Sequence, residues 1–514
     1  MSRKVIFLLL VILIIAVFFR FWKINQIPPG LYPDEAMNGN NALEAIKTGD
    51  FKLFYPENNG REGLFINLEA VSLMIFGNQP WALRIVSALF GFLTVLGLFF
   101  LAKEVFPQKP SVPYFSAFLL AVSFWHVNFS RIGFRAIMTP LCLVWFFVLL
   151  LIAFRQKKIF SALLSGIFFG LGFHTYIVFR IAPLLAFVPV VYYFLVFKHE
   201  KNLKKYFSIL AVWLITAFII AAPLAFYFLK HPDDFLSRSA PISILYDSKP
   251  LLAFFQNIGR SLLMFNFSGD CNWRHNLSCW PELEFLSGIF FIIGIYLIIK
   301  NFRKKQAGLT EWTMIIWFIA LGLPALLTKE GMPHALRSIG LIPAVFLAAG
   351  SGMAEFFHWL KQKIKNKRVF INVFALIILF ISGFEGCRYF VFWANNSHVK
   401  DAFSQPYWEI GQYLNNLPAS TNKYIIVNTG GVLVKDIPMP SQSVMFLTNT
   451  YLSSEQKKKN FYYFLPENLD KMEIKKPVYL IPLAKNEETK NLIIQKCPDC
   501  QFKDYSSFWV FENK

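Results

Sequence analysis

Charged residues are scarce in this chain of 514 residues: Asp, Glu, Lys and Arg together make up 16% of it, against roughly 25% in an ordinary soluble domain. Hydrophobic residues make up 55%, and phenylalanine alone occurs 59 times. A soluble core does not need so much apolar surface, so the composition predicts a polytopic α-helical membrane protein. No A-x-A-like cleavage site follows the first apolar segment, Val5 to Trp22, so we expect that segment to remain as a membrane helix.

Acidic residues are scarcer than basic ones: 31 Asp and Glu stand against 51 Lys and Arg, a formal net charge of +20. A basic chain is a candidate for nucleic-acid binding, but here the positive residues gather between apolar stretches. The clusters are SRK (2–4), RQKK (155–158), KHEKNLKK (198–205), KNFRKK (300–305) and KQKIKNKR (361–368). Such clusters are typical of cytoplasmic loops, so they indicate topology and contact with membrane lipids, and no nucleic-acid partner.

About eleven apolar stretches reach the length of a membrane span. They lie near 5–22, 81–102, 112–128, 136–154, 160–176, 180–197, 206–229, 283–299, 311–328, 337–356 and 369–391. An odd total with a cytoplasmic N-terminus places every basic cluster inside and the C-terminus outside. The segment 251–267 carries Gln256, Asn257 and Arg260 near its middle, which predicts an interfacial or re-entrant helix.

Four loops then face outward, at 23–80, 130–140, 230–282 and 328–338. The first contains an apolar run at 64–76, which we expect to form an amphipathic helix on the membrane surface. From about Ala394 the chain becomes more polar, which predicts a membrane domain (1–393) and a small extracytoplasmic α/β domain (394–514). Its predicted helices are 406–418 and 488–495, and its predicted strands are 423–429, 443–450, 477–483 and 506–512.

Cysteine is rare, and its six positions are Cys142, Cys271, Cys279, Cys387, Cys497 and Cys500. Cys142 and Cys387 lie in apolar stretches and are expected to be inert core residues. The other four form two close pairs, one flanking NWRHNLS and one in CPDC. A C-x-x-C pair suits redox chemistry or half a zinc site, but no second pair has zinc-finger spacing. Outside the cytoplasm disulfides are the simpler interpretation, and the sequence leaves the choice open.

The adjacent acids Asp34 and Glu35 follow the first apolar segment, within GLYPDEAMNGNNALE. After Pro33 and before a helical pattern, they fit the first turn of a helix, where carboxylates interact favourably with the helix dipole. An acid pair just outside a membrane also suits a general base or a metal site. The pair alone leaves these alternatives open.

Arginines are unexpected on the outer side of a membrane, yet six lie in outer loops or at outer helix ends: Arg61, Arg131, Arg135, Arg180, Arg274 and Arg337. Arginine binds phosphate through paired hydrogen bonds, so the group predicts a phosphate site; the alternative for each is a salt bridge or a lipid headgroup. His174, Tyr176, His275 and His334 are further candidates for this cavity, with a structural role as the alternative. No H-x-x-H or H-E-x-x-H pattern supports a dedicated metal site, and dependence on a divalent metal stays open.

Several segments resemble the membrane glycosyltransferases of the GT-C fold, in particular bacterial relatives of protein O-mannosyltransferases (glycosyltransferase family 39) and of the lipid A aminoarabinose transferase. The resemblance rests on GLYPDEAMNGNNALEAIKTGDF, on GREGLFINLEAVSLMIFGNQPWALRIVSALFGF, and on SRIGFRAIMTPL, GLGFHTYIVFRIAPLL, GDCNWRHN and MPHALRSIGLIPAVFLAAGSG. It covers roughly the first two thirds of the chain, to about residue 355.

The resemblance implies transfer of a sugar from a polyprenyl-phosphate carrier to a protein or lipid acceptor on the outer face of the plasma membrane. It places Asp34 as the catalytic base and Glu35 as a neighbouring structural or acceptor-orienting acid. Many relatives carry Lys-Pro-Pro or His-Pro-Pro where this chain has Gly60-Arg61-Glu62-Gly63, so Arg61 and Glu62 are candidates for the positive charge and a second acid.

The chemistry agrees with this expectation. A hydroxyl acceptor benefits from a carboxylate that takes its proton, and a phosphate leaving group needs cationic stabilisation but no general acid. In-line attack would invert the anomeric centre. Two other functions remain: a transporter or flippase of lipid-linked sugars, although no internal repeat is found, and a sugar-binding or scaffold role for 394–514 beside an idle membrane part.

Overall fold

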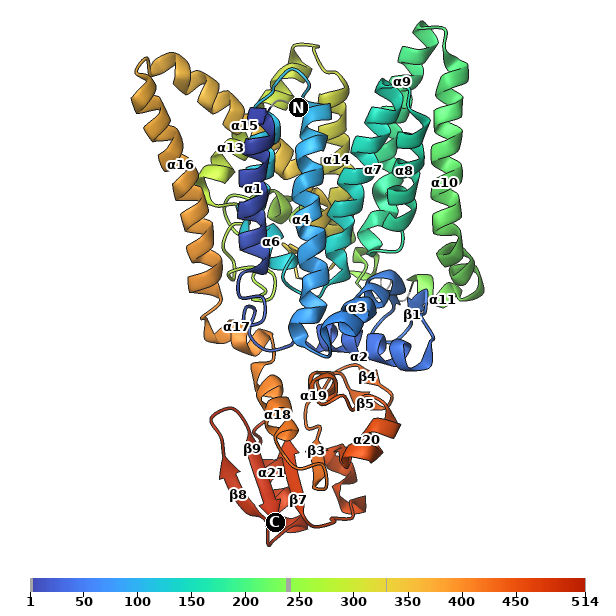
Figure 1. The fold of residues 1–514 in the computed structure, drawn as a ribbon, viewed down its shortest axis with the longest axis vertical. Helices are drawn as coiled ribbons and strands as arrows, with labels where there is room; N and C mark the ends of the chain where they lie inside the picture. Colours follow the sequence, from blue (N-terminus) through green and yellow to red (C-terminus); the bar gives the residue numbers. More distant parts are fainter. Residues whose placement is uncertain (1–2, 237–241, 330, 514) are drawn as a thin grey trace. The chain divides into compact units, whose positions relative to one another are not determined.

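The computed structural model describes residues 3–236, 242–329 and 331–513, and it divides the chain into two compact units (Figure 1). The helical unit comprises Met1–Trp22 and Ser87–Trp393, and the α/β unit comprises Lys23–Val86 and Ala394–Lys514. The expected first outer loop thus shares a unit with the C-terminal segment. Ser2 of the first basic cluster, and residues 237–241 and Glu330 of the expected outer loops, lie outside the described residues.

Eight helices among the described residues are long and apolar enough to cross a membrane, as expected of a multi-pass membrane protein. They are Pro80–Val105 (α4), Arg135–Arg155 (η1 and α7), Ile177–His199 (η2 and α9), Leu203–Lys230 (α10), Phe285–Arg303 (α13), Leu309–Leu326 (α14), Ile339–Lys363 (η4 and α15) and Lys367–Trp393 (α16 and its π-helical end). Two shorter helices of this unit, α11 (Pro232–Leu236) and α12 (Pro250–Leu263), are not among these eight. The α12 helix corresponds to the segment expected to be interfacial or re-entrant.

The other three expected spans form shorter apolar helices. The stretch 112–128 is split into α5 (Val112–Val122) and α6 (Phe124–Phe129), because Ser123 between them takes an extended conformation with ψ 126°. The helix α8 (Ile159–Gly172) ends before His174, where turns begin. The apolar part of α1 (Arg3–Phe21) begins only at Val5. Hydrophobicity located all three segments, but it did not reveal the break within 112–128 or the early end of α8.

Helices α13 and α15 approach each other closely through two glycines. A Cβ atom on Gly294 would lie 2.0 Å from the carbonyl oxygen of Ala348, and one on Gly352 would lie 1.9 Å from that of Phe290. Small residues allow membrane helices to bring their backbones together and gain van der Waals contact, since lipid supplies little hydrophobic driving force.

Replacing Gly352 by leucine should therefore force α13 and α15 apart. Overpacking at such a contact destabilises by roughly 1–3 kcal/mol, so we expect a lower thermal unfolding temperature and less monodisperse protein in detergent. Gly383→Leu in α16 is the matched control, because a Cβ atom there meets nothing within 4 Å. Equal losses in the two variants would contradict the packing argument.

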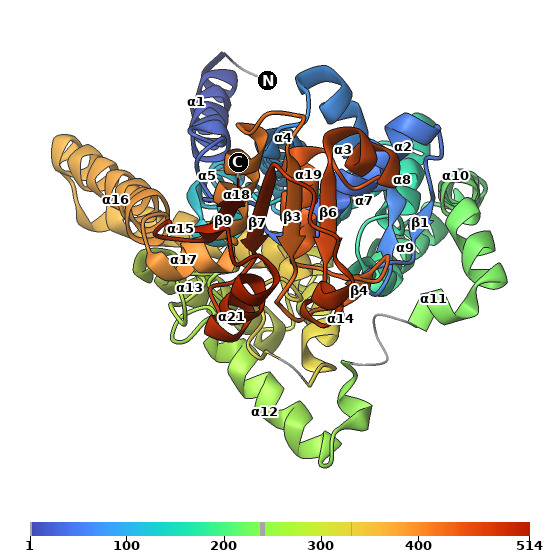
Figure 2. The same cartoon turned by 90° about the horizontal axis from the view of Figure 1, so that it is seen from below.

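The α/β unit contains a five-stranded sheet in the order β6-β3-β7-β9-β8, and Figure 2 shows β9, β7, β3 and β6 side by side. The strands are β3 (Asn422–Ile426), β6 (Phe461–Phe464), β7 (Val478–Pro482), β8 (Gln501–Asp504) and β9 (Trp509–Asn513). The strand β3 is parallel to both of its neighbours, β6 and β7, whereas β9 is antiparallel to β7 and β8. The sheet is mixed, with antiparallel strands at one edge.

The remaining elements of this unit include two short antiparallel strand pairs. They are β1 (Phe54–Tyr55) with β2 (Arg61–Glu62), and β4 (Leu433–Val434) with β5 (Ile437–Pro438). Its helices are α2 (Pro33–Thr48), α3 (Gly63–Phe76), α17 (Ser397–Ala402), α18 (Gln405–Asn415), α19 (Ser441–Thr448), α20 (Ser453–Lys459) and α21 (Glu487–Lys496).

One predicted strand of this unit is wrong. The segment 443–450 falls mostly in α19, whose residues Val444, Met445 and Phe446 are all buried. A short apolar run that is buried on every side has no periodicity that separates strand from helix. The strands β6 and β8 were not predicted.

The first outer loop shares a hydrophobic core with the C-terminal segment of the α/β unit. Leu31 before α2, Ile66 of α3 and Leu83 pack in one buried cluster with Phe446 of α19. On α3 the polar Glu69 and Ser72 face inward, whereas Val71, Met74 and Ile75 are exposed. An exposed apolar face is what we expect of a helix that lies on a membrane surface.

Both close cysteine pairs form disulfides, Cys271–Cys279 and Cys497–Cys500, which confirms the simpler interpretation. Cys142 is buried, as expected, but Cys387 is exposed. The prediction of a core position for Cys387 is wrong, because most of α16 is not covered by the rest of the described structure.

Candidate functional site

The two acids in the first turn of α2 have different surroundings. Asp34 is half-buried, and Asn58 donates a hydrogen bond from Nδ2 to its Oδ1 at 2.9 Å. Glu35 is fully buried and forms an ion pair with Arg84, whose Nε lies 3.0 Å from Oε1. Glu35 also accepts a hydrogen bond from the backbone N–H of Tyr32 at 3.3 Å, which caps the helix. Asp34 therefore keeps access to solvent, while Glu35 has a structural position.

Arg84 is the main residue of this region that the sequence did not reveal. It is buried, and besides Glu35 it donates to the carbonyl oxygens of Pro28 at 2.6 Å and Gly30 at 2.8 Å. These bonds fasten the chain before α2 to the beginning of α4. The signal for this role was a lone arginine at the start of an apolar span, since such a charge needs a buried partner.

Arg61 and Glu62 are buried inside the α/β unit. Arg61 donates from Nη1 to Asn38 Oδ1 at 2.7 Å and from Nη2 to Asn41 Oδ1 at 2.5 Å. Both asparagines lie on α2, so Arg61 holds α2 to the β1–β2 hairpin. Glu62 precedes the first residue of α3. This placement favours positioning of α2 over direct contact with a substrate.

Glu69 of α3 is a buried acid without a hydrogen-bond partner for either carboxylate oxygen among the described residues. Burial raises the pKa of Glu69 well above its usual range, and the negative charge of Glu35 raises it further. The side chain is therefore expected to be neutral, which makes Glu69 a poor candidate for a base at neutral pH.

In the helical unit, Tyr176, Arg180 and Arg337 line one cavity of about 340 Å³. The guanidinium of Arg180 lies 4.1 Å from the ring centre of Phe235 and donates from Nη1 to the Phe235 carbonyl oxygen at 2.9 Å. The remaining lining is mostly apolar: Ile177, Val178, Ile181, Ile242, Ser243, Pro324, Leu327 and Thr328. The structure thus brings two of the six predicted arginines to one cavity, which suits an anion attached to an apolar group.

A larger hollow of about 710 Å³ shares Arg180 and Phe235 with this cavity. Its other lining residues are apolar and come mainly from α10 and α11: Phe173, Ala221, Leu224, Ala225, Phe228, Leu229 and Pro232. Arg180 therefore stands where an apolar groove meets a cavity with a second arginine. This combination fits an amphiphile with an anionic head and a hydrocarbon tail.

Three other predicted residues join helices. Arg131 is fully buried and donates to the carbonyl oxygens of Phe19 at 3.1 Å and Trp22 at 2.8 Å. The guanidinium of Arg135 lies 5.7 Å from the ring centre of Tyr176, which lines the cavity. His174 donates from Nε2 to the carbonyl oxygen of Ile220 at 2.9 Å, which connects the end of α8 to α10. Through these contacts Arg131 binds the end of α1 and His174 binds α10.

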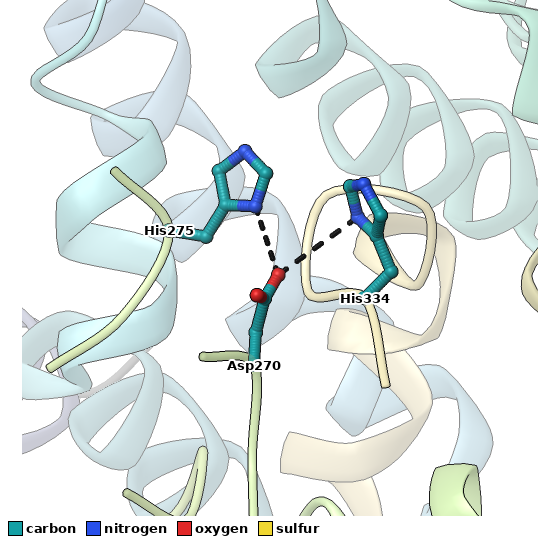
Figure 3. A group of neighbouring side chains, drawn as sticks. All are labelled: Asp270, His275 and His334. Carbon is teal, nitrogen blue, oxygen red and sulfur yellow. Dashed lines mark hydrogen bonds and ion pairs between the residues drawn. The ribbon is translucent and has the colours of Figure 1, made fainter. Parts of the chain in front are cut away.

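His275 and His334 converge on Asp270 (Figure 3). His275 Nδ1 lies 2.8 Å and His334 Nδ1 lies 3.9 Å from the same oxygen, Asp270 Oδ2. Asp270 was not among the predicted site residues, although it lies in the same GDCNWRHN segment as His275. The predicted Arg274, next to His275 in the chain, donates from Nε to Asn272 Oδ1 at 3.3 Å.

Burial and neighbouring charges change the pKa values of Asp270 and His334 in this cluster. Burial alone would raise the pKa of Asp270, but the hydrogen bond from His275 and the charge of that histidine bring it below its ordinary value. Burial, followed by the charges of His275 and Arg337, lowers the pKa of His334 well below its ordinary value. His334 is therefore neutral at neutral pH, the form in which imidazole binds metals.

Comparison with known proteins places these features in context. Residues 65–227, less than half of the chain, match the model of the family described as dolichyl-phosphate-mannose-protein mannosyltransferase. The structure is similar to that of ArnT from Cupriavidus metallidurans bound to undecaprenyl phosphate, with a TM-score of 0.60 and 12% sequence identity over 99% of this chain and 97% of that chain. No curated protein matches the chain.

A second similar structure is the archaeal oligosaccharyltransferase AglB from Archaeoglobus fulgidus in complex with an inhibitory peptide and a dolichol-phosphate. Its TM-score is 0.50 and its sequence identity 15%, over 100% of this chain and 74% of that chain. At these identities the likeness establishes the fold. This fold agrees with the family that the sequence segments resemble. It also agrees with a membrane part that is followed by a small C-terminal part containing β-strands. The chain has the GT-C fold of membrane glycosyltransferases.

Proposed function

We propose that this protein transfers a sugar from a polyprenyl-phosphate carrier to a protein or lipid acceptor at the outer face of the plasma membrane. The observation that carries the proposal is the cavity with Arg180 and Arg337 next to the apolar groove along α10. Guanidinium groups suit the phosphate, and the groove suits the hydrocarbon. Two similar structures hold such lipids: ArnT is bound to undecaprenyl phosphate and AglB is in complex with a dolichol-phosphate.

In the proposed reaction each of a few side chains has one chemical role. Arg180 and Arg337 stabilise the negative charge that gathers on the phosphate as it leaves the sugar. Asp34 takes the proton of the acceptor hydroxyl, a role that its half-exposed carboxylate supports. Glu35, held by Arg84, fixes the start of α2 and with it Asp34. Attack opposite the leaving phosphate inverts the anomeric centre, and the C-terminal segment lies outside the cytoplasm in this proposal.

Sugar transfer in detergent is the direct test. Purified full-length protein would be incubated with radiolabelled pentose and hexose derivatives of undecaprenyl phosphate, together with membrane lipids or envelope proteins as acceptors. We expect labelled acceptor and released undecaprenyl phosphate in the absence of any membrane compartment. Movement of the intact donor across liposome membranes with no covalent product would instead favour a transporter.

Removing either cavity arginine should weaken binding of the lipid phosphate. A hydrogen bond to a charged group contributes about 1.5–3 kcal/mol, so Arg337→Ala and Arg180→Met should each lower the affinity for undecaprenyl phosphate by about 10-fold or more. Titration of the protein in detergent, followed by tryptophan fluorescence, measures this affinity.

Two controls locate the effect at the phosphate. Arg260→Ala removes an exposed arginine of α12 and should leave the affinity unchanged. Undecaprenol, which has the same tail but no phosphate, should bind the native protein and the Arg337→Ala variant equally. If all variants bind the lipid phosphate with equal affinity, this cavity is not the phosphate site.

A further inference from the structure

Three side chains of metal-ligating type converge from two separate loops of the helical unit (Figure 3). Asp270 and His275 lie between α12 and α13, and His334 lies between α14 and η4. One nitrogen or oxygen atom from each residue lies within 4.8 Å of the others. Ligand atoms sit about 2.0–2.2 Å from a bound zinc ion, so atoms this close can share one ion after small side-chain rotations.

The hydrogen bonds at the cluster leave two acceptor atoms facing each other. The backbone N–H of Arg337 donates to His334 Nδ1 at 3.3 Å, so this nitrogen carries a lone pair. Asp270 Oδ2 already accepts from the backbone N–H of Ala335 at 2.9 Å and from His275 at 2.8 Å. A lone pair and a carboxylate oxygen at 3.9 Å repel each other in a buried setting. A cation between them replaces this repulsion with two favourable bonds.

A second buried carboxyl group, that of Glu282, lies beside the cluster. Glu282 is fully buried; its Oε1 accepts from the backbone N–H of Asp270 at 3.0 Å, and its Oε2 has no hydrogen-bond partner among the described residues. The nearby guanidinium of Arg388 is shared with Glu385, whose Oε2 lies 3.7 Å from Arg388 Nη1. Glu282 therefore fixes the backbone of Asp270 and leaves one buried carboxyl oxygen, Oε2, next to it, while burial raises the pKa of Glu282 well above its ordinary value.

We propose that Asp270, His275 and His334 bind one Zn²⁺ ion. Two imidazoles and one carboxylate are a donor set typical of zinc, whereas Mg²⁺ prefers oxygen ligands only. The ion joins the loop before α13 to the loop before η4, and the second of these loops also carries Arg337 of the arginine cavity. The site stabilises the fold, and its existence does not depend on which reaction the protein catalyses.

Zinc binding by the full-length protein in detergent tests the proposal. After treatment with a chelator and dialysis into metal-free buffer, the protein would be titrated with Zn²⁺ in competition with a chromophoric chelator. We expect close to one zinc per chain, a higher thermal unfolding temperature with zinc, and no competition from Mg²⁺. Losing a supporting residue outside the ligand set commonly lowers metal affinity 10–100-fold, so His275→Ala and His334→Ala should each lower it by at least about 100-fold.

Matched variants separate a metal site from a hydrogen-bonded network. His358→Ala removes an exposed histidine of α15 and should keep full zinc binding. Asp270→Asn keeps the shape of the side chain but should bind zinc weakly. Less than about one tenth of a zinc per native chain, or native affinity in the His275 and His334 variants, would overturn the proposal. If those variants fail to fold, X-ray absorption at the zinc edge of the native protein decides: two imidazole ligands support the site, and their absence overturns it.

Discussion

Replacing Asp34 by asparagine is expected to lower sugar transfer by at least about 100-fold and to leave the protein folded. A positioned general base contributes about 10²–10⁴-fold to a rate, and an amide cannot take the proton of an acceptor hydroxyl. The fold should survive, because an asparagine oxygen can still accept the hydrogen bond that Asn58 donates to Oδ1. The loss should appear in kcat, while the affinity for undecaprenyl phosphate stays unchanged, since the donor phosphate is assigned to Arg180 and Arg337.

The measurement is transfer of radiolabelled sugar by purified variants, with the thermal unfolding temperature as a check on folding. Asp50→Asn is the matched control, because Asp50 is an exposed aspartate that closely follows α2 and should be dispensable. Glu35→Gln should also reduce transfer, but together with a lower unfolding temperature, because Glu35 is buried against Arg84. Full transfer by the Asp34→Asn variant would reject Asp34 as the base.

Replacing Arg84 by methionine is expected to destabilise the α/β unit by about 3–5 kcal/mol. Removing one partner of a buried ion pair leaves the other charge unpaired in a medium of low dielectric constant. Here the unpaired group is Glu35, and the carbonyl oxygens of Pro28 and Gly30 also lose their donor. Faster proteolysis of the α/β unit and a lower unfolding temperature in detergent should report the effect.

Two comparisons show whether the buried charge is the cause. Lys47→Met breaks the partly exposed pair of Lys47 with Glu455, 2.6 Å apart in the same unit, and should change stability by at most about 1 kcal/mol. The double variant Arg84→Met with Glu35→Leu removes both charges and should be more stable than Arg84→Met alone. If Arg84→Met unfolds no more readily than Lys47→Met, the pair does not hold the start of α2.

The sequence identified many of the candidate site residues, but it did not predict which residues contact each other. The acid pair stood out because Asp34 and Glu35 follow a membrane segment, and a helix start was predicted there. Their division into a half-exposed and a buried acid depends on Arg84, which lies 49 positions after Glu35. Nothing in local spacing indicates that contact, because it forms only when the start of α4 packs beside α2.

The contacts of the six outer arginines could not be predicted from local sequence either. Their positions suggested one phosphate site. In the structure Arg61 binds two asparagines of α2, Arg131 binds the end of α1, and Arg180 and Arg337 line one cavity. An arginine that binds phosphate and one that binds buried carbonyl oxygens have the same sequence context. The difference comes from the groups that the folded chain places around each guanidinium.

The amino-acid sequence alone was enough to establish the membrane class, the apolar segments that become membrane helices, the resemblance to GT-C enzymes and Asp34 as the residue to test. These features depend on composition, on hydrophobic runs and on short motifs, all of which are local. Tertiary structure decided the break at Ser123, the helical state of 443–450, the core shared by the first outer loop and the C-terminal segment, and the convergence of Asp270 with His334. Each of these depends on burial by residues distant in the chain, because packing of distant segments decides which polar groups lose water and which partners must replace it.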